Sequence, residues 1–350
     1  MKVSVIVPVY NVARYLGECL DSVAAASRAF LARETDGDVE LVCVDDGSTD
    51  GSDEVLERFA QELSGPGRRP SFRAVRQANA GVGAARNAGL ALASGDWVWF
   101  VDGDDVIHPE ALTVLSESLR ENPDVDFVRL QNHLAETLPA RWGRVGGEVQ
   151  RYRRNEAARL AHGLNGASQY LIRRSVVGGL RFEPYRWLED VLFVMRCLKK
   201  GGDMLEIPDV LYFYRKREGS AIHSQRTREQ VAEIFQATDV LVSVADEVMG
   251  GFPDTDWRPF LKCLHPFAYF AFHREYFALC ASDRQALLDD WLALQDRFVG
   301  RYPMPLEWRV RLALVRFFHS GLLVTPLVLW GASWRGRVAR LVNKARTRGR

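Results

Sequence analysis

Cysteine is scarce in this sequence, and none of it shows the spacing of a metal site or a disulfide framework. Its five cysteines lie far apart among 350 residues, and no two of them are separated by only two residues. Disulfide-rich folds and zinc ribbons need closely spaced pairs, so this usage excludes both and is typical of a reducing compartment. We therefore expect a cytoplasmic protein.

Long apolar runs are also rare. The first run ends at Pro8 without a small-residue cleavage site after it, so we expect no signal peptide. Phe317–Trp334 has no Asp, Glu, Lys or Arg for 18 residues, but polar residues and Pro326 interrupt it. This stretch is at the lower limit of a membrane span, and it also suits a helix that packs on a domain.

Negative charge is absent from the C-terminal segment. Residues 308–350 contain ten Lys or Arg and no Asp or Glu, which leaves residues 1–307 with a net charge of −9. An acidic body with a basic tail disfavours nucleic acid as a partner and favours an anionic membrane surface. The alternatives for the tail are a solvated basic helix end and a peripheral attachment to the inner face of the plasma membrane, and we favour the attachment.

Alternating strand and helix patterns fill the first hundred residues. Apolar runs at 3–9, 39–44 and 97–101 predict strands, a further strand is expected at 72–77, and helical spacing separates them. This order predicts an α/β fold with a mainly parallel sheet and helices on both faces, in which ligands bind at the carboxyl ends of the strands. Two short strands are expected at 204–207 and 211–215, and helices from about Thr227 onward.

Two acidic clusters directly follow predicted strands. The first begins with Asp45 and Asp46, which point to opposite faces, so one can meet a ligand while the other supports the loop. A simple turn that caps the next helix explains these residue types as well. In the second cluster, the mutual repulsion of Asp102, Asp104 and Asp105 favours a bound Mg²⁺ or Mn²⁺, with a solvated acidic turn as the alternative.

Four other residues carry candidate chemistry. Arg86 lies one turn into a predicted helix that opens after Gly81, and a helix N-terminus with an arginine favours a diphosphate. It occupies the place of a small residue in a dinucleotide fingerprint, which excludes a dehydrogenase. Glu189 and Asp190 begin a further helix, where acidic residues usually complement the helix dipole. Phosphate binding by Arg217, in a polar loop, is chemically reasonable but unspecific.

The order and spacing of these motifs closely resemble those of family 2 glycosyltransferases. The resemblance is dense over residues 1–110 and sparser to about residue 223. It implies the GT-A fold and transfer of a sugar from a nucleotide diphosphate with inversion at the anomeric carbon. The segments that carry it are Pro8–Asn11, Asp45–Ser52, Asn79–Gly89, Asp102–Asp105 and Glu189–Asp190.

The resemblance also implies roles for individual residues. Asp45 would accept the uracil N3–H, and Arg86 would contact the diphosphate. Asp102 and Asp104 would hold Mn²⁺ or Mg²⁺, although the additional Asp105 leaves open which carboxylates touch the metal. Asp190, beside Glu189, would be the general base. The complete set of expected donor-binding residues is Pro8, Val9, Tyr10, Asp45, Asn79, Arg86, Asp102 and Arg217.

We expect a domain organisation of three parts, of which the resemblance covers only the first. Residues 1–225 would form the GT-A catalytic domain, 226–307 a helical region and 308–350 the basic amphipathic tail. We expect a UDP-sugar as donor and a glycan or lipid-linked acceptor, in cell-surface or exopolysaccharide synthesis. The alternatives are a non-catalytic sugar-nucleotide-binding protein, which has no need of a base, and a sugar nucleotidyltransferase, which would prefer a glycine-rich loop after the first strand.

Overall fold

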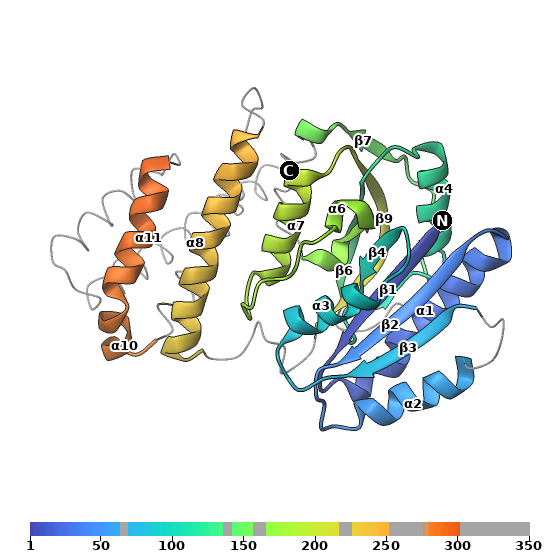
Figure 1. Cartoon of the computed structure of the whole chain (residues 1–350), viewed down its shortest axis with the longest axis horizontal. Helices are drawn as coiled ribbons and strands as arrows, with labels where there is room; N and C mark the ends of the chain where they lie inside the picture. The colour runs from blue at the N-terminus through green and yellow to red at the C-terminus, as the bar shows by residue number, and fades with distance from the viewer. Residues whose placement is uncertain are drawn as a thin grey trace, which may run out of the picture. The chain divides into compact units, whose positions relative to one another are not determined.

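The computed structural model describes residues 1–63, 69–135, 142–156, 166–216, 226–251, 276 and 279–301 (Figure 1). The chain divides into two compact units. One consists of Met1–Ser224 with Val240–Cys263, and the other of Gln225–Asp239 with Leu264–Arg350. The basic tail and Arg217 lie outside the described residues, and the three-part domain organisation stays a prediction.

A nine-stranded sheet, counted within the described residues, forms the centre of the first unit. Its strand order is β3-β2-β1-β4-β8-β6-β9-β5, and β7 pairs with β9. The first four strands are parallel, whereas β8 is antiparallel to both of its neighbours. The strands are β1 (Lys2–Val9), β2 (Asp38–Asp45), β3 (Ser71–Arg76), β4 (Trp97–Phe100), β5 (Val106–Ile107), β6 (Phe127–Ala135), β7 (Gln150–Tyr152), β8 (Tyr170–Arg173) and β9 (Met204–Arg215).

Helices cover both faces of this sheet (Figure 1). On one face, α1 and α4 pack on the odd-numbered valines of β1, and on the other α3 packs against Ile6. Burial of β1 on both faces explains why Val3–Val9 is apolar except for the buried Ser4, and the expected α/β class is confirmed. The helices are α1 (Ala13–Arg33), α2 (Ser52–Leu63), α3 (Val82–Leu92), α4 (Ala111–Glu121), α6 (Arg174–Val177) and α7 (Glu189–Lys200), with a short 3₁₀ turn at Ala167–Gln169.

The turn after β2 caps the first helix across the fold. The backbone N–H of Val12 donates to Ser52 Oγ at 3.1 Å, and that of Ala13 donates to Asp50 Oδ2 at 2.9 Å. Asn11 has a φ of 51°, and its Oδ1 accepts from the N–H of Thr49 at 2.8 Å. These contacts satisfy donors at the start of α1 that have no partner within the helix, and they join the carboxyl ends of β1 and β2.

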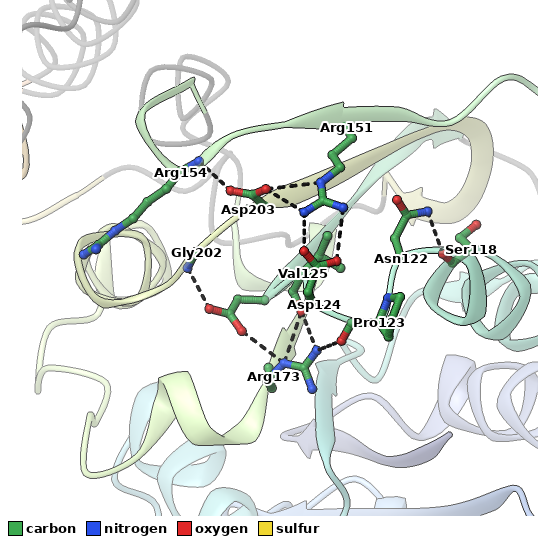
Figure 2. Close-up of polar contacts among 11 residues, drawn as sticks. Ser118, Asn122, Pro123, Asp124, Val125, Arg151, Arg154, Arg173, Gly202 and Asp203 are labelled. Carbon is green, nitrogen blue, oxygen red and sulfur yellow. Dashed lines mark hydrogen bonds and ion pairs between the residues drawn. The ribbon is translucent and has the colours of Figure 1, made fainter.

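A network of arginines and aspartates stabilises the sheet near the amino end of β4, away from the carboxyl ends of β1 and β2 (Figure 2). Arg151 donates to both Asp124 and Asp203, with shortest distances of 2.6 and 2.7 Å. Arg173 donates to the carbonyl oxygen of Val125 at 2.6 Å, and it pairs with Trp97 at the amino end of β4. These contacts hold β7 and β8 in place, and they lie away from the strand ends where ligands of α/β sheets bind.

The second unit is helical in its described residues, as expected. Its helices are α10 (Ala281–Ala286) and α11 (Leu288–Arg301), while α8 (Arg228–Gly250) contributes residues to both units. Tyr276 stacks on Trp291 with ring centroids 5.5 Å apart, and Arg297 forms an ion pair with Asp239. None of the described helices is both long and apolar enough to cross a membrane.

Gly89 lets α3 pack directly on β1, and this contact generates a stability prediction. A Cβ at Gly89 would overlap Cγ2 of Ile6, which is fully buried. We expect Gly89→Ala to lower the free energy of unfolding by about 1–3 kcal/mol, the usual effect of overpacking, as measured by urea denaturation.

Gly17→Ala is the matched control. Gly17 lies within α1, and a Cβ there would meet nothing within 4 Å. This substitution should raise the free energy of unfolding by about 0.5–1 kcal/mol because alanine is the better helix former. Equal effects of the two substitutions would show that α3 does not depend on this close approach.

Candidate active site

The carboxyl ends of β1, β2 and β4 bring the expected donor-binding segments to one edge of the sheet. Val9 pairs with Asp45, and Ile6 pairs with Phe100, two residues before Asp102. Parallel strands end at the same edge, so segments far apart in the sequence become neighbours here. The sequence predicted this convergence.

The residues after β1 and β3 are open to solvent at this edge. Tyr10 exposes 49% of its surface, and Asn79 is exposed, whereas Pro8 and Val9 are buried in β1. Gly47, with a φ of 77°, lies close to the Asn79 backbone, since a Cβ there would be 3.1 Å from the Asn79 nitrogen. An aromatic ring and an amide group are thus available beside the end of β2.

Asp45 and Asp46 have different roles. Asp46 is buried and accepts from Gln77 Nε2 at 2.7 Å and from the N–H groups of Ala80 and Gly81 at 2.9 and 2.8 Å. It therefore supports the loop that leads into α3. Asp45 Oδ1 accepts from the N–H of Ser48 at 2.8 Å, whereas Oδ2 has no hydrogen bond to a described residue but forms an ion pair with Arg76 Nε at 3.4 Å. Because a carboxylate oxygen has two lone pairs, Oδ2 can still accept a hydrogen bond.

Arg86 lies at the centre of the site and joins three elements. It is buried in α3, and its two terminal nitrogens donate to Asp102 Oδ1 at 2.8 Å and to Glu189 Oε1 at 2.9 Å. Its guanidinium lies 5.4 Å from the ring centroid of Phe182. The expected contact with a diphosphate stays a prediction, because protein carboxylates occupy both terminal nitrogens in this structure.

The three aspartates in the loop after β4 differ in burial. Asp102 and Asp104 are half-buried, whereas Asp105 is buried. Asp105 Oδ2 accepts from the Tyr212 hydroxyl at 2.5 Å, and Oδ1 accepts from the N–H of Arg215 at 2.8 Å. Burial, together with the charges of Asp102 and Asp104, raises the pKa of Asp105 to about 8.

The chemistry of this loop fits a hard divalent cation. Carboxylate oxygens are the preferred ligands of Mg²⁺ and Mn²⁺, and one or two carboxylates suffice where substrate phosphates complete the coordination. Asp102 and Asp104 supply two, and their repulsion on Asp105 is the strain that a cation would relieve. Among the described residues, no three His, Cys, Asp or Glu side chains are arranged to hold a metal by themselves.

Asp190 lies in the first turn of α7, next to Glu189. The contacts of Arg86 with Asp102 and Glu189 form the arginine bridge of this site. Asp190 Oδ1 accepts from the N–H of Val191 at 2.7 Å, while a Cβ on Gly166 would overlap its Oδ2. Burial raises the pKa of Asp190, and the nearby Arg86 opposes this shift. The pKa of Glu189 is raised as well, by burial and then by the charge of Asp190, again against Arg86. Asp190 is therefore a stronger base than an exposed aspartate.

The segment before α7 is held by residues that the sequence did not single out for this purpose. Asn87 exchanges two hydrogen bonds with the backbone of Phe182, at 2.8 and 3.0 Å. The Phe182 ring stacks on Phe193 at 4.0 Å between centroids, and both rings meet Phe100 edge-on. The adjacent Arg86-Asn87 pair in the third helix was the only sequence signal for this contact.

Comparison with known proteins assigns the chain to a family. The model of the family described as "Glycosyl transferase family 2" matches residues 4–179, which is half of the chain. This protein therefore belongs to glycosyl transferase family 2, as the motifs predicted.

Similar proteins agree with this assignment. The uncharacterized glycosyltransferase EpsJ of Bacillus subtilis (strain 168) is 30% identical over 227 residues, which cover 62% of each chain. Glycosyltransferase GlyG of Streptococcus pneumoniae serotype 4 is 26% identical over 270 residues, or 71% of this chain and 81% of GlyG. The match to EpsJ thus spans less than two thirds of that protein.

A solved structure confirms the GT-A-type fold. The crystal structure of S. aureus TarS 1-349, in complex with UDP-GlcNAc, matches with a TM-score of 0.63 at 20% sequence identity. The match covers 85% of this chain and 81% of that one.

The arginine bridge generates a second stability prediction. Arg86→Met leaves the buried Glu189 and the half-buried Asp102 without their cation, so we expect a loss of about 3–5 kcal/mol in the free energy of unfolding. Urea denaturation measures this loss.

Arg33→Met is the control for the same side-chain change. Arg33 pairs with Glu110 at 3.2 Å, but its side chain is 56% exposed, so the effect should stay below about 1 kcal/mol. A loss at Arg86 no larger than that at Arg33 would contradict a central role for the bridge.

Proposed function

We propose that this chain is an inverting, metal-dependent glycosyltransferase. It moves a sugar from a nucleotide-diphosphate sugar, with a UDP-sugar as the expected donor, to a hydroxyl of a glycan or lipid-linked acceptor in cell-surface or exopolysaccharide synthesis. The observation that carries the proposal is the Arg86 bridge, which ties the Asp102 loop at the donor edge to the start of α7, where Asp190 lies. Membership in the family and the UDP-GlcNAc complex of TarS support it.

The donor would bind across the ends of β1, β2 and β4. The ring of Tyr10, half exposed, can cover the face of a nucleobase. Asp45 Oδ2 accepts no hydrogen bond from a described residue, and beside its ion pair with Arg76 it could accept one from a ring N–H. Asn79 is exposed beside them and can reach the nucleoside. Arg217, at the start of a segment outside the described residues, remains a candidate for a phosphate contact.

Asp102 and Asp104 would hold Mn²⁺ or Mg²⁺ beside the diphosphate. A cation there supplies neutralisation of the charge that develops on the leaving diphosphate. Arg86 adds a fixed positive charge in a buried position and keeps the Asp102 carboxylate in one orientation.

Asp190 would act as the general base. It takes the proton from the acceptor hydroxyl while that oxygen forms its bond to the anomeric carbon and the bond from that carbon to the diphosphate breaks. A single displacement inverts the anomeric centre and needs no nucleophilic side chain. Gly166 leaves room beside Asp190 Oδ2, and the ion pair of Glu189 with Arg86 fixes the helix start that carries the base.

The Asp190→Asn variant tests the reaction. In a screen of nucleotide sugars with Mn²⁺, wild-type protein should release UDP, and NMR of the product should show an inverted anomeric configuration. Asp190→Asn should lower kcat by about 10²- to 10⁴-fold with nearly unchanged UDP affinity, because the base acts in the transition state.

Because burial raises the pKa of Asp190, kcat should fall on acidification at a pH above the usual aspartate value of about 3.9.

Asp38→Asn serves as the control for this substitution. Asp38 is exposed at the amino end of β2, at the opposite edge of the sheet, and its substitution should leave kcat unchanged.

Release of pyrophosphate from UTP would indicate a nucleotidyltransferase instead. Binding of UDP-sugars without turnover would indicate a sugar-nucleotide-binding protein, and retention of configuration would contradict the single displacement.

We further propose that the basic tail attaches the protein to the inner face of the plasma membrane, where lipid-linked acceptors lie. The support is the charge of residues 308–350, which lie outside the described part of the chain. Each basic residue near an anionic surface contributes about 1 kcal/mol.

Vesicle sedimentation tests this attachment. The full chain should pellet with anionic vesicles at low salt and be released as ionic strength rises, because the Debye length is only ~10 Å at 0.1 M salt. A variant with glutamine at the seven basic positions after Trp334 should stay in the supernatant. Binding that resists about 1 M salt would indicate apolar insertion by Phe317–Trp334, and no binding at low salt would leave the tail as a solvated end.

A further inference from the structure

Tyr212 connects the two ends of the acidic loop from a distant strand. It lies on β9, is fully buried, and donates its hydroxyl to Asp105 Oδ2 at 2.5 Å. The same hydroxyl oxygen accepts from the backbone N–H of Asp102 at 3.1 Å. One side chain therefore holds both the first and the last residue of the Asp102–Asp105 loop.

The position of this hydroxyl is set by strand pairing. Ile107, two residues after the loop, pairs with Tyr212 between β5 and β9, and β9 in turn pairs with β6. The Tyr212 ring also lies 6.4 Å from the Trp99 ring on β4. Tyr212 is thus fixed by the sheet and by core packing, independently of the loop that it holds.

Arg215, at the end of β9, makes two further contacts with the loop. The N–H of Arg215 donates to Asp105 Oδ1 at 2.8 Å, and Arg215 Nε donates to the carbonyl oxygen of Asp104 at 2.8 Å. Within the loop, the N–H of Asp105 donates to the carbonyl oxygen of Asp102 at 2.9 Å. These contacts set the spacing of the loop without using the Asp102 carboxylate, which Arg86 orients from α3.

We propose that Tyr212 is a positioning residue for the cation site, and that Asp105 is the internal anchor of the loop and not a metal ligand. Both carboxylate oxygens of Asp105 are engaged by β9 in a buried position, whereas Asp102 and Asp104 are half-buried. The hydroxyl joins Asp105 to the backbone of Asp102, so the loop that carries the two ligands is held in one conformation before a cation binds. This inference rests on the proposed metal site at Asp102 and Asp104.

Mn²⁺ binding by the Tyr212→Phe variant tests the proposal. The substitution removes one oxygen atom, which leaves Asp105 Oδ2 without its donor and the Asp102 N–H without its acceptor. Residues that orient metal ligands typically contribute 10- to 100-fold to metal affinity, so we expect Mn²⁺ to bind about 10- to 100-fold more weakly. Electron paramagnetic resonance of free Mn²⁺, titrated with the full-length protein in the presence of UDP, measures this loss. Excess Mn²⁺ should restore turnover.

Tyr170→Phe is the matched control. Tyr170 is equally buried, on β8 of the same sheet, and makes no described contact with the acidic loop. Its substitution should leave Mn²⁺ affinity unchanged. Wild-type Mn²⁺ affinity in Tyr212→Phe, or an equal loss in both variants, would overturn the proposal.

Asp105→Asn gives a second test that does not depend on Tyr212. Asparagine keeps one oxygen for the Tyr212 hydroxyl, but its NH2 group then faces the Arg215 N–H, so one of the two contacts of Asp105 with β9 is lost. Because the Tyr212 contact remains, Mn²⁺ affinity should still fall much less than in Asp104→Asn. Equal losses in these two variants would make Asp105 a ligand and overturn the assignment. If Mn²⁺ binds as expected but no nucleotide sugar is turned over, the proposed reaction fails while the role of Tyr212 stands.

Discussion

The buried guanidinium of Arg86 is the interaction on which the arrangement of the candidate site depends. It joins Asp102 after β4 to Glu189 at the start of α7, two positions separated by more than eighty residues of chain. Burying a single charge costs several kcal/mol unless hydrogen-bonded partners of opposite charge surround it. The buried Arg86 and Glu189 therefore depend on each other's charge, and Arg86 holds the half-buried Asp102 beside them.

Small residues in α3 allow this bridge to form. A Cβ on Gly83 would lie 3.2 Å from the carbonyl oxygen of Glu183, and one on Gly89 would overlap Ile6. The helix therefore approaches both the sheet and the segment before α7, and this brings Arg86 between its two carboxylates. The Asn87 contacts with the Phe182 backbone then hold that segment in register with the helix.

In each of the two acidic clusters, the neighbouring aspartates make different contacts. After β2, Asp46 binds the backbone of the loop before α3, while Asp45 Oδ2 has an ion pair with Arg76 but no hydrogen bond to a described residue. After β4, Asp105 is spent on β9, while Asp102 and Asp104 are half-buried. In both clusters one buried carboxylate organises backbone, and under the proposed function its neighbour would meet the ligand, which is a common requirement of preorganised sites.

The sequence by itself determined the α/β class, the first four strands and the strand-end positions of the acidic clusters, because unbroken apolar runs and helical spacing are local signals. It predicted two short strands at 204–207 and 211–215, whereas β9 is continuous, since a register shift against β6 accommodates the interruption. The different burial and contacts of Asp104 and Asp105 were decided only by tertiary structure. They depend on Tyr212, which lies 107 residues from Asp105 and which no local pattern connects to it, because only the pairing of β5 with β9 brings the two together.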